Sequence, residues 1–329
     1  MYDLPWIDGH LDIAYVALNG RDLTRPCPDP AAGCISLPDL QAGRVAIAFA
    51  TLYTQPVERA DECPCNYPAA DAQAAHAAAG RQLELYRALE RDGQLSILHE
   101  PPAQLSPADP PRIVLLMEGA DPIRSPEDVA AWAEAGLRLV GLTWALGTRY
   151  AGGNARPGPL TGAGRELVAA LDERGLIHDV SHLCDESFDG LLACARGPIV
   201  ATHSNARAVI GGDNQRHLHD DQIRAIAARD GVIGLNLFSK FLVTGRRATI
   251  RDCVEHVLHI CQIMGHTRGV ALGSDADGGF APPQMPDGLE HPRHYPRLLE
   301  ALAAAGFDAE ALRGFAYENW LRLLRRPTI

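Results

Sequence analysis

Short apolar runs alternate with longer amphipathic stretches along the whole chain. The runs are rich in β-branched residues and almost continuously apolar, as is typical of strands buried on both faces of a parallel sheet. They predict eight strands, at residues 5–7, 44–52, 113–117, 137–142, 176–179, 199–202, 232–236 and 270–272.

The stretches between these runs carry the periodicity of helices. They predict helices at residues 69–92, 126–135, 161–174, 185–195, 220–228 and 249–264, with further helices closing the fold at 295–326. The segments 21–43 and 54–68 are rich in Pro, Cys and Asp and are predicted to be loops. Because no linker or repeat divides the chain, we expect one domain over residues 1–329, an α/β fold of the (β/α)8 TIM-barrel type. A doubly wound open sheet is the competing architecture.

Composition and charge narrow the possible functions. The net charge of −11 argues against binding to nucleic acid, because a phosphate backbone requires a basic face. No apolar run approaches the ~18 residues of a membrane span, and the first residues lack a secretory signal pattern. The eight cysteines are scattered, which indicates reduced thiols in a soluble, cytoplasmic protein. Among them, Cys63-Pro64-Cys65 is predicted to lie in a solvent loop.

Candidate metal ligands follow five predicted strands directly. The segments that carry them are Asp8-Gly9-His10-Leu11-Asp12, Met117-Glu118-Gly119, Asp179-Val180-Ser181-His182, Ala201-Thr202-His203-Ser204 and Gly273-Ser274-Asp275-Ala276-Asp277-Gly278. His10 and Asp12 are two apart on an extended segment, so both can reach one cation. Barrel enzymes place their active sites at the C-terminal ends of the strands, and imidazole with carboxylate suits zinc.

Each motif alone also has a structural explanation. A His-x-Asp pair can be a turn with a capping carboxylate, Glu118 can begin a helix, and His203 can be a satisfied core histidine. The aspartates at 275 and 277 resemble part of a calcium loop, but the rest of that loop is missing. The joint occurrence of all five motifs at one predicted rim favours a metal site.

The ordered motifs Asp-Gly-His-x-Asp, Glu-Gly, Asp-x-Ser-His, (Ser/Thr)-His-Ser and Gly-Ser-Asp-x-Asp-Gly resemble those of the membrane dipeptidase (renal dipeptidase) family, peptidase family M19 of the amidohydrolase superfamily. The resemblance extends from about Trp6 to Gly279. It implies a homodimer of barrels that each hold two zinc ions. The implied ligands are His10 and Asp12 for one ion, His182 and His203 for the other, Glu118 as the bridge and Asp275 beside the first ion.

The chemistry that follows is metal-dependent hydrolysis of dipeptides. Two adjacent zinc ions lower the pKa of a shared water and leave a bridging hydroxide that attacks the carbonyl. Asp275 is expected to take the proton and return it to the leaving amine. Three carboxylates and one hydroxide would balance the four positive charges of two zinc ions. The resemblance also implies that Arg216 holds the substrate carboxylate, with Arg207 as the alternative.

Two positions depart from the family pattern and leave the substrate open. Trp144 stands where the family has a histidine after strand four, and Phe238 stands where a substrate-contacting tyrosine is expected. We expect both to face the substrate, and N-acyl amino acids, including D-residues, are therefore an alternative to dipeptides. A catalytically silent metal-binding scaffold is a further hypothesis. Asp275 argues against it, because a structural site needs no additional proton acceptor.

Overall fold

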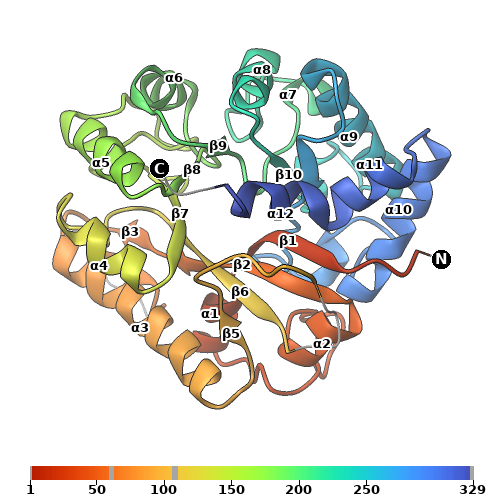
Figure 1. Cartoon of the computed structure of the whole chain (residues 1–329), viewed down its shortest axis with the longest axis horizontal. Helices are drawn as coiled ribbons and strands as arrows, with labels where there is room; N and C mark the ends of the chain where they lie inside the picture. The colour runs from red at the N-terminus through yellow and green to blue at the C-terminus, as the bar shows by residue number, and fades with distance from the viewer. Residues whose placement is uncertain (1, 59–62, 106–109, 327–329) are drawn as a thin grey trace.

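The computed structural model describes residues 2–58, 63–105 and 110–326, which form an α/β fold with helices around parallel strands (Figure 1). Each of the eight predicted runs contains a strand, and three short strands are added to them. The strands are β1 (Trp6–Leu11), β2 (Val45–Tyr53), β3 (Gln55–Val57), β4 (Asn66–Pro68), β5 (Ser96–Ile97), β6 (Arg112–Glu118), β7 (Leu137–Gly141), β8 (Ile177–Asp179), β9 (Ile199–Val200), β10 (Ile233–Leu235) and β11 (Val270–Leu272).

The strands of the main sheet follow one another in chain order. The order is β1-β2-β6-β7-β8-β9, with β5 beside β6, and β10 pairs with β11. A parallel bridge between Ala201 and Ile233 continues the pairing from the end of β9 to β10. Beyond β11, the Asp275 N–H donates to the His10 carbonyl at 3.1 Å. The sheet is thus curled into a half-barrel, as in a TIM-type barrel, and its sequential order excludes the doubly wound alternative.

Helices cover the outside of this sheet, and the six predicted helices between strands are all confirmed. The helices are α1 (Ile13–Leu18), α2 (Leu37–Ala42), α3 (Ala72–Arg91), α4 (Asp128–Glu134), α5 (Gly162–Glu173), α6 (Asp185–Cys194), α7 (Arg207–Ile210), α8 (Asp220–Ala228), α9 (Ile250–Met264), α10 (Tyr295–Ala304), α11 (Ala309–Arg313) and α12 (Asn319–Leu324). Side-chain caps define several starts: Asp71 accepts from Ala74 N–H at α3, and Thr161 accepts from Gly164 N–H at α5. None of the helices in the described ranges combines the length and the apolar character of a membrane span.

The loop predictions for two segments were wrong in part. The segment 21–43 contains α2, because Ser36 caps this helix and Leu37 and Leu40 are buried in the core. The segment 54–68 contains β3 and β4, which pair in parallel; residues 59–62 of this segment lie outside the described part of the chain.

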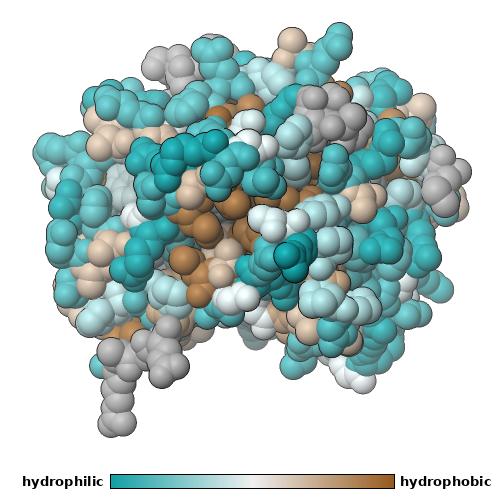
Figure 2. All heavy atoms as spheres, turned by 90° about the horizontal axis from the view of Figure 1, so that it is seen from below, coloured by the Kyte–Doolittle hydropathy of each residue, from teal (hydrophilic) through white to brown (hydrophobic). Residues whose placement is uncertain are grey.

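The inside of the curled sheet is filled by apolar side chains and by α12. Inward-facing strand residues pack with Trp320 in one cluster, whose strand members are Ile7, Ile47, Phe49, Val114, Leu116, Leu139, Ile177, Val200 and Ala271. The Trp320 indole donates to the Leu272 carbonyl at 2.7 Å. A Cβ on Gly9 would lie 2.6 Å from the Trp320 ring, so this position of β1 requires glycine. On the face seen in Figure 2, hydrophilic residues predominate and a group of apolar residues lies near the centre.

Candidate metal centre

The fold brings all six predicted metal-site residues together at the C-terminal ends of the strands. His10 lies in β1 with Asp12 just after it, Glu118 ends β6, and the others follow β8, β9 and β11. All six are buried: His10, Asp12, Glu118, His182, His203 and Asp275. Ligand atoms of five of them form two sets that share His10, namely His10 with Glu118 and His203, and His10 with Asp12 and Asp275, whereas His182 belongs to neither set.

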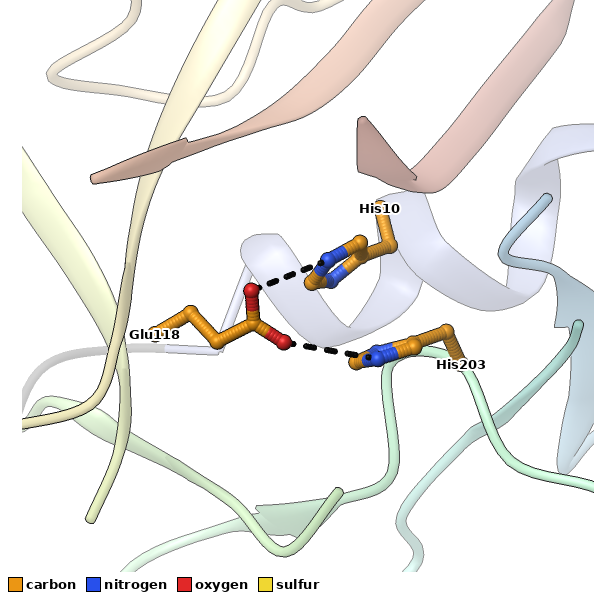
Figure 3. Close-up of side chains that lie close together, drawn as sticks. All are labelled: His10, Glu118 and His203. Carbon is orange, nitrogen blue, oxygen red and sulfur yellow. Dashed lines mark ion pairs between the residues drawn. The ribbon is translucent and has the colours of Figure 1, made fainter. Parts of the chain in front are cut away.

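Glu118 lies between two groups of side chains and turns one carboxylate oxygen toward each. Its Oε2 is 3.6 Å from His10 Nε2, whereas its Oε1 is 3.5 Å from His203 Nε2 (Figure 3). The same Oε1 is 3.3 Å from His182 Nε2. His10 Nε2 also lies 3.9 Å from Asp12 Oδ1. The two oxygens of one carboxylate therefore face two different groups of candidate ligands.

Two histidines face each other across this site in a way that fits a shared cation. The Nε2 atoms of His182 and His203 are 2.9 Å apart. Burial lowers the pKa of His182 to about 4 and lowers that of His203 well below its usual value, so both rings are neutral at pH 7. On the opposite side of the first ring, His182 Nδ1 lies 3.0 Å from Asn154 Oδ1, which favours a proton on Nδ1 and a lone pair on Nε2.

Buried polar atoms of the site also fit a metal. Within the described ranges, His10 Nε2 and Glu118 Oε1 have no hydrogen-bond partner. Buried polar atoms are normally paired, so an unpaired imidazole nitrogen and an unpaired carboxylate oxygen that converge are what a cation would satisfy.

The buried carboxylates around His10 carry more negative charge than the nearby cationic groups balance. Burial and the nearby Glu118 raise the pKa of Asp12 to about 6. Burial, with Asp12 and Glu118, raises the pKa of Asp275 to about 8. Burial opposes a charge on His10, but Glu118 and Asp12 outweigh it and raise the pKa of His10 to about 10. Divalent cations at this position would offset the buried negative charge.

A cavity of about 420 Å³ opens onto these residues and has two aromatic walls. On one side, Phe238 stacks on Phe280 with ring centroids 4.6 Å apart, and Phe241 meets Phe238 edge-on. On the other side, Trp144 meets Tyr53 edge-on with centroids 5.5 Å apart. The described residues that line the cavity are Asp12, Tyr15, Tyr53, Gln55, Cys63, Asn66, Glu118, Trp144, His182, His203, Phe238, Phe241, Asp275, Gly278, Gly279 and Phe280.

Trp144 and Phe238, the two positions that depart from the family pattern, both line the cavity. The sequence interpretation missed Tyr15, Tyr53, Phe241 and Phe280. It was also wrong about the cysteine pair, because Cys63 lines the cavity and Cys65 is buried rather than solvent-exposed.

Arg216 lies beside the metal centre but behind the cavity wall. Its guanidinium is buried, donating to the His203 carbonyl at 2.7 Å and to Ser204 Oγ at 3.1 Å. Its Cζ lies 5.1 Å from the centroid of the Phe241 ring, and its Nε has no partner among the described residues. Arg207, the alternative, is held in a two-pronged ion pair with Asp185 at 2.6 and 2.9 Å. The arrangement favours Arg216 as the cation nearer the metal centre.

Comparisons with known proteins agree with this site. The sequence model of the family described as membrane dipeptidase, peptidase family M19, matches residues 1–328. An uncharacterised Klebsiella pneumoniae protein, from the region 5′ of pqqA, is 36% identical over 211 residues, which are 60% of this chain and 75% of that protein. An uncharacterised dipeptidase of Schizosaccharomyces pombe is 34% identical over 165 residues, 50% of this chain but only 39% of the relative.

Among solved structures, a metallo peptidase from Rhodobacter sphaeroides, liganded with a phosphinate mimic of the dipeptide L-Ala-D-Ala, is similar over nearly its whole length. The TM-score is 0.84 at 27% identity, with 98% of this chain and 99% of that chain covered. Together with the match to the family model, this shows that the chain belongs to the membrane dipeptidase family, the metallodipeptidases of peptidase family M19.

Proposed function

We propose that this protein is a two-zinc dipeptidase that hydrolyses small dipeptides with a free C-terminal carboxylate. The observation that carries the proposal is the position of Glu118, whose two oxygens face two separate groups of ligands. His10 and Asp12 would hold one ion, and His182 and His203 the other. When bound, two such ions lower the pKa of a shared water and polarise the scissile carbonyl.

Asp275 is the group we assign to proton transfer. Its carboxylate lines the cavity, and Asn236 Nδ2 donates to its Oδ2 at 2.8 Å, which orients it. A carboxylate held in this way can accept the proton of the attacking water and return it to the leaving amine, as general base and then general acid.

The cavity supports a small substrate with apolar side chains. Its volume of about 420 Å³ lies within the ordinary range for small-molecule sites. Apart from the proposed metal-site residues, no lining side chain of the described cavity carries a formal charge, and both walls are aromatic. We assign the substrate carboxylate to Arg216, whose unpaired buried Nε–H is a donor without an acceptor. The Phe241 ring lies against the Arg216 guanidinium, so movement of this ring would open a path from the cavity to Arg216.

N-acyl amino acids, including D-residues, are the second candidate substrate class. The stacked Phe238 and Phe280 rings form an apolar wall that can hold an acyl chain as well as the side chain of a dipeptide. The absence of a hydroxyl on Phe238 also removes one donor that a peptide carboxylate could use.

Metal analysis and a substrate screen test the proposal together. Protein purified without chelator is expected to hold about two zinc ions per chain, and Asp275→Asn is expected to keep at least one ion while losing hydrolysis. Dipeptides and N-acyl amino acids should be compared in both L and D series. Metal-free wild-type protein would overturn the proposal. Zinc-loaded protein that is inert on the whole screen would favour the scaffold hypothesis instead.

A further inference from the structure

One hydroxyl lies between histidines that belong to opposite halves of the metal centre. Thr202 follows β9, and its side chain is completely buried. Its Oγ1 is 2.9 Å from His203 Nδ1, 3.2 Å from His10 Nδ1 and 2.6 Å from Asp179 Oδ2. Residues 10 and 202 are 192 positions apart in the chain, so only the curled sheet brings them together.

The proton count at Thr202 determines the tautomer of both rings. A threonine hydroxyl has one proton to donate and two lone pairs that accept. Asp179 takes that proton, because its other oxygen already accepts the N–H groups of Ser181 and Thr202, both at 3.0 Å. The Ser181 hydroxyl is farther from Thr202 Oγ1, at 3.4 Å, and does not compete for it.

Thr202 Oγ1 must therefore accept from both histidines. His10 and His203 then each carry a proton on Nδ1, which leaves Nε2 as the nitrogen that can bind a cation at the metal centre. These two Nε2 atoms face opposite oxygens of Glu118, at 3.6 and 3.5 Å, and the two rings lie against each other with centroids 3.6 Å apart.

We propose that Thr202, held by Asp179, is a positioning residue shared by both metal positions. The metal part of this inference rests on the proposed function, whereas the tautomer part does not. His182 supplies the contrast, because it has its own partner, Asn154, and no contact with Thr202 among the described hydrogen bonds. Loss of the Thr202 hydroxyl should disturb one ligand of each ion, and loss of the Asn154 amide should disturb a ligand of one ion only.

Three variants separate these effects. Thr202→Val keeps the shape and removes the hydroxyl, Thr202→Ser keeps the hydroxyl, and Asn154→Ala is the matched control on a single ligand. Competition with a chelator should show both zinc affinities reduced by about 10–100-fold in Thr202→Val, near wild-type values in Thr202→Ser, and one affinity reduced in Asn154→Ala. Equal weakening in Thr202→Val and Thr202→Ser, or unchanged affinities in Thr202→Val, would overturn the proposal.

A second readout needs neither zinc nor a folded variant. Nitrogen-15 NMR of metal-free wild-type protein should show a proton on Nδ1 of both His10 and His203, and an unprotonated Nδ1 in either ring would refute the assignment. If the wild-type protein binds no metal, the proposed function fails, yet this measurement still tests the arrangement around Thr202. Circular dichroism and the thermal midpoint of each variant control for folding.

Discussion

Asp8 connects the two ends of the curled sheet beneath the metal centre, and its removal should destabilise the protein strongly. This buried carboxylate accepts from Ser274 N–H at 2.8 Å, Ser274 Oγ at 2.5 Å, Tyr295 Oη at 3.2 Å and His10 N–H at 3.3 Å. His10 is the metal-site residue of the first strand, and Ser274 precedes Asp275 after the last strand. Asp8 therefore sets the distance between His10 and Asp275.

The expected cost can be worked from these contacts. Asp8→Ala leaves up to four buried donors without an acceptor, and each unsatisfied group costs about 1–3 kcal/mol. Because a water molecule can enter the space and the hydroxyls can turn to other partners, we expect a loss of about 3–5 kcal/mol in the free energy of unfolding. Asp8→Asn keeps an oxygen for the two N–H groups and points its amide at two hydroxyls that can accept, so a loss of only about 1–2 kcal/mol is expected.

Urea unfolding and thermal scans of the metal-free protein measure these differences. The thermal midpoint should fall by about 6–10 °C in Asp8→Ala, at roughly 2 °C per kcal/mol for a chain of this size. Asp221→Ala, at an exposed carboxylate of α8, is the control and should change little. The reasoning is refuted if Asp8→Ala unfolds like the wild type, or if Asp8→Asn is as damaging as Asp8→Ala.

Two further predictions concern the cavity and the pH dependence of stability. Phe238→Ala should lower kcat/KM for dipeptides with a large apolar residue by about tenfold, which corresponds to about 1.4 kcal/mol of lost contact energy. The kcat/KM for Gly-Gly and the zinc content should stay unchanged, and equal losses of kcat/KM on both substrates would contradict the prediction. His217 is buried, and its ring nitrogens have no partners within the described ranges. Burial, with Arg216, His256 and Arg207 nearby, lowers its pKa from 6.5 to about 3. As the pH falls, the unfolded chain therefore protonates His217 at a higher pH than the folded protein does. The stability that His217 contributes is complete above pH 6.5 and is lost as the pH falls toward 3, by up to ~1.4 kcal/mol per pH unit. Urea titrations at pH 7, 5.5 and 4.5 should show a smaller acid loss in His217→Asn than in the wild type, and parallel pH profiles would count against this explanation.

Much of the fold could be predicted because strands buried on both faces leave a strong local signal. Runs such as Val45–Tyr53 are almost entirely apolar, and their burial on both sides of the sheet is the physical reason. The short helices were harder. Helix α2 has six residues in a segment rich in Pro, Cys and Asp, and it forms because Ser36 caps it and the core accepts Leu37 and Leu40. Tertiary burial decides such a helix, and local composition does not show it.

The candidate metal ligands were predictable for a different reason. Each stands at the end of a strand, and parallel strands in sequential order bring all their C-terminal ends to one rim. A local signal, a polar residue just after an apolar run, therefore carries three-dimensional information. Among the described residues, Glu118, His203 and Asp275 were found in this way.

The residues that orient those ligands and shape the cavity have no such signal. Thr202 and Asp179 belong to the sequence motifs, but nothing local shows that they orient other residues, and Asn154 lies in an irregular loop, 28 positions from the histidine it orients. Phe241 and Phe280 belong to segments after different strands, and both pack on the Phe238 ring. A hydrogen bond that spans 192 positions depends on the curl of the whole sheet, so no local pattern can encode it. Metal ligation in this fold can be predicted from strand ends, whereas the choice of substrate depends on loops and pairings that only the structure reveals.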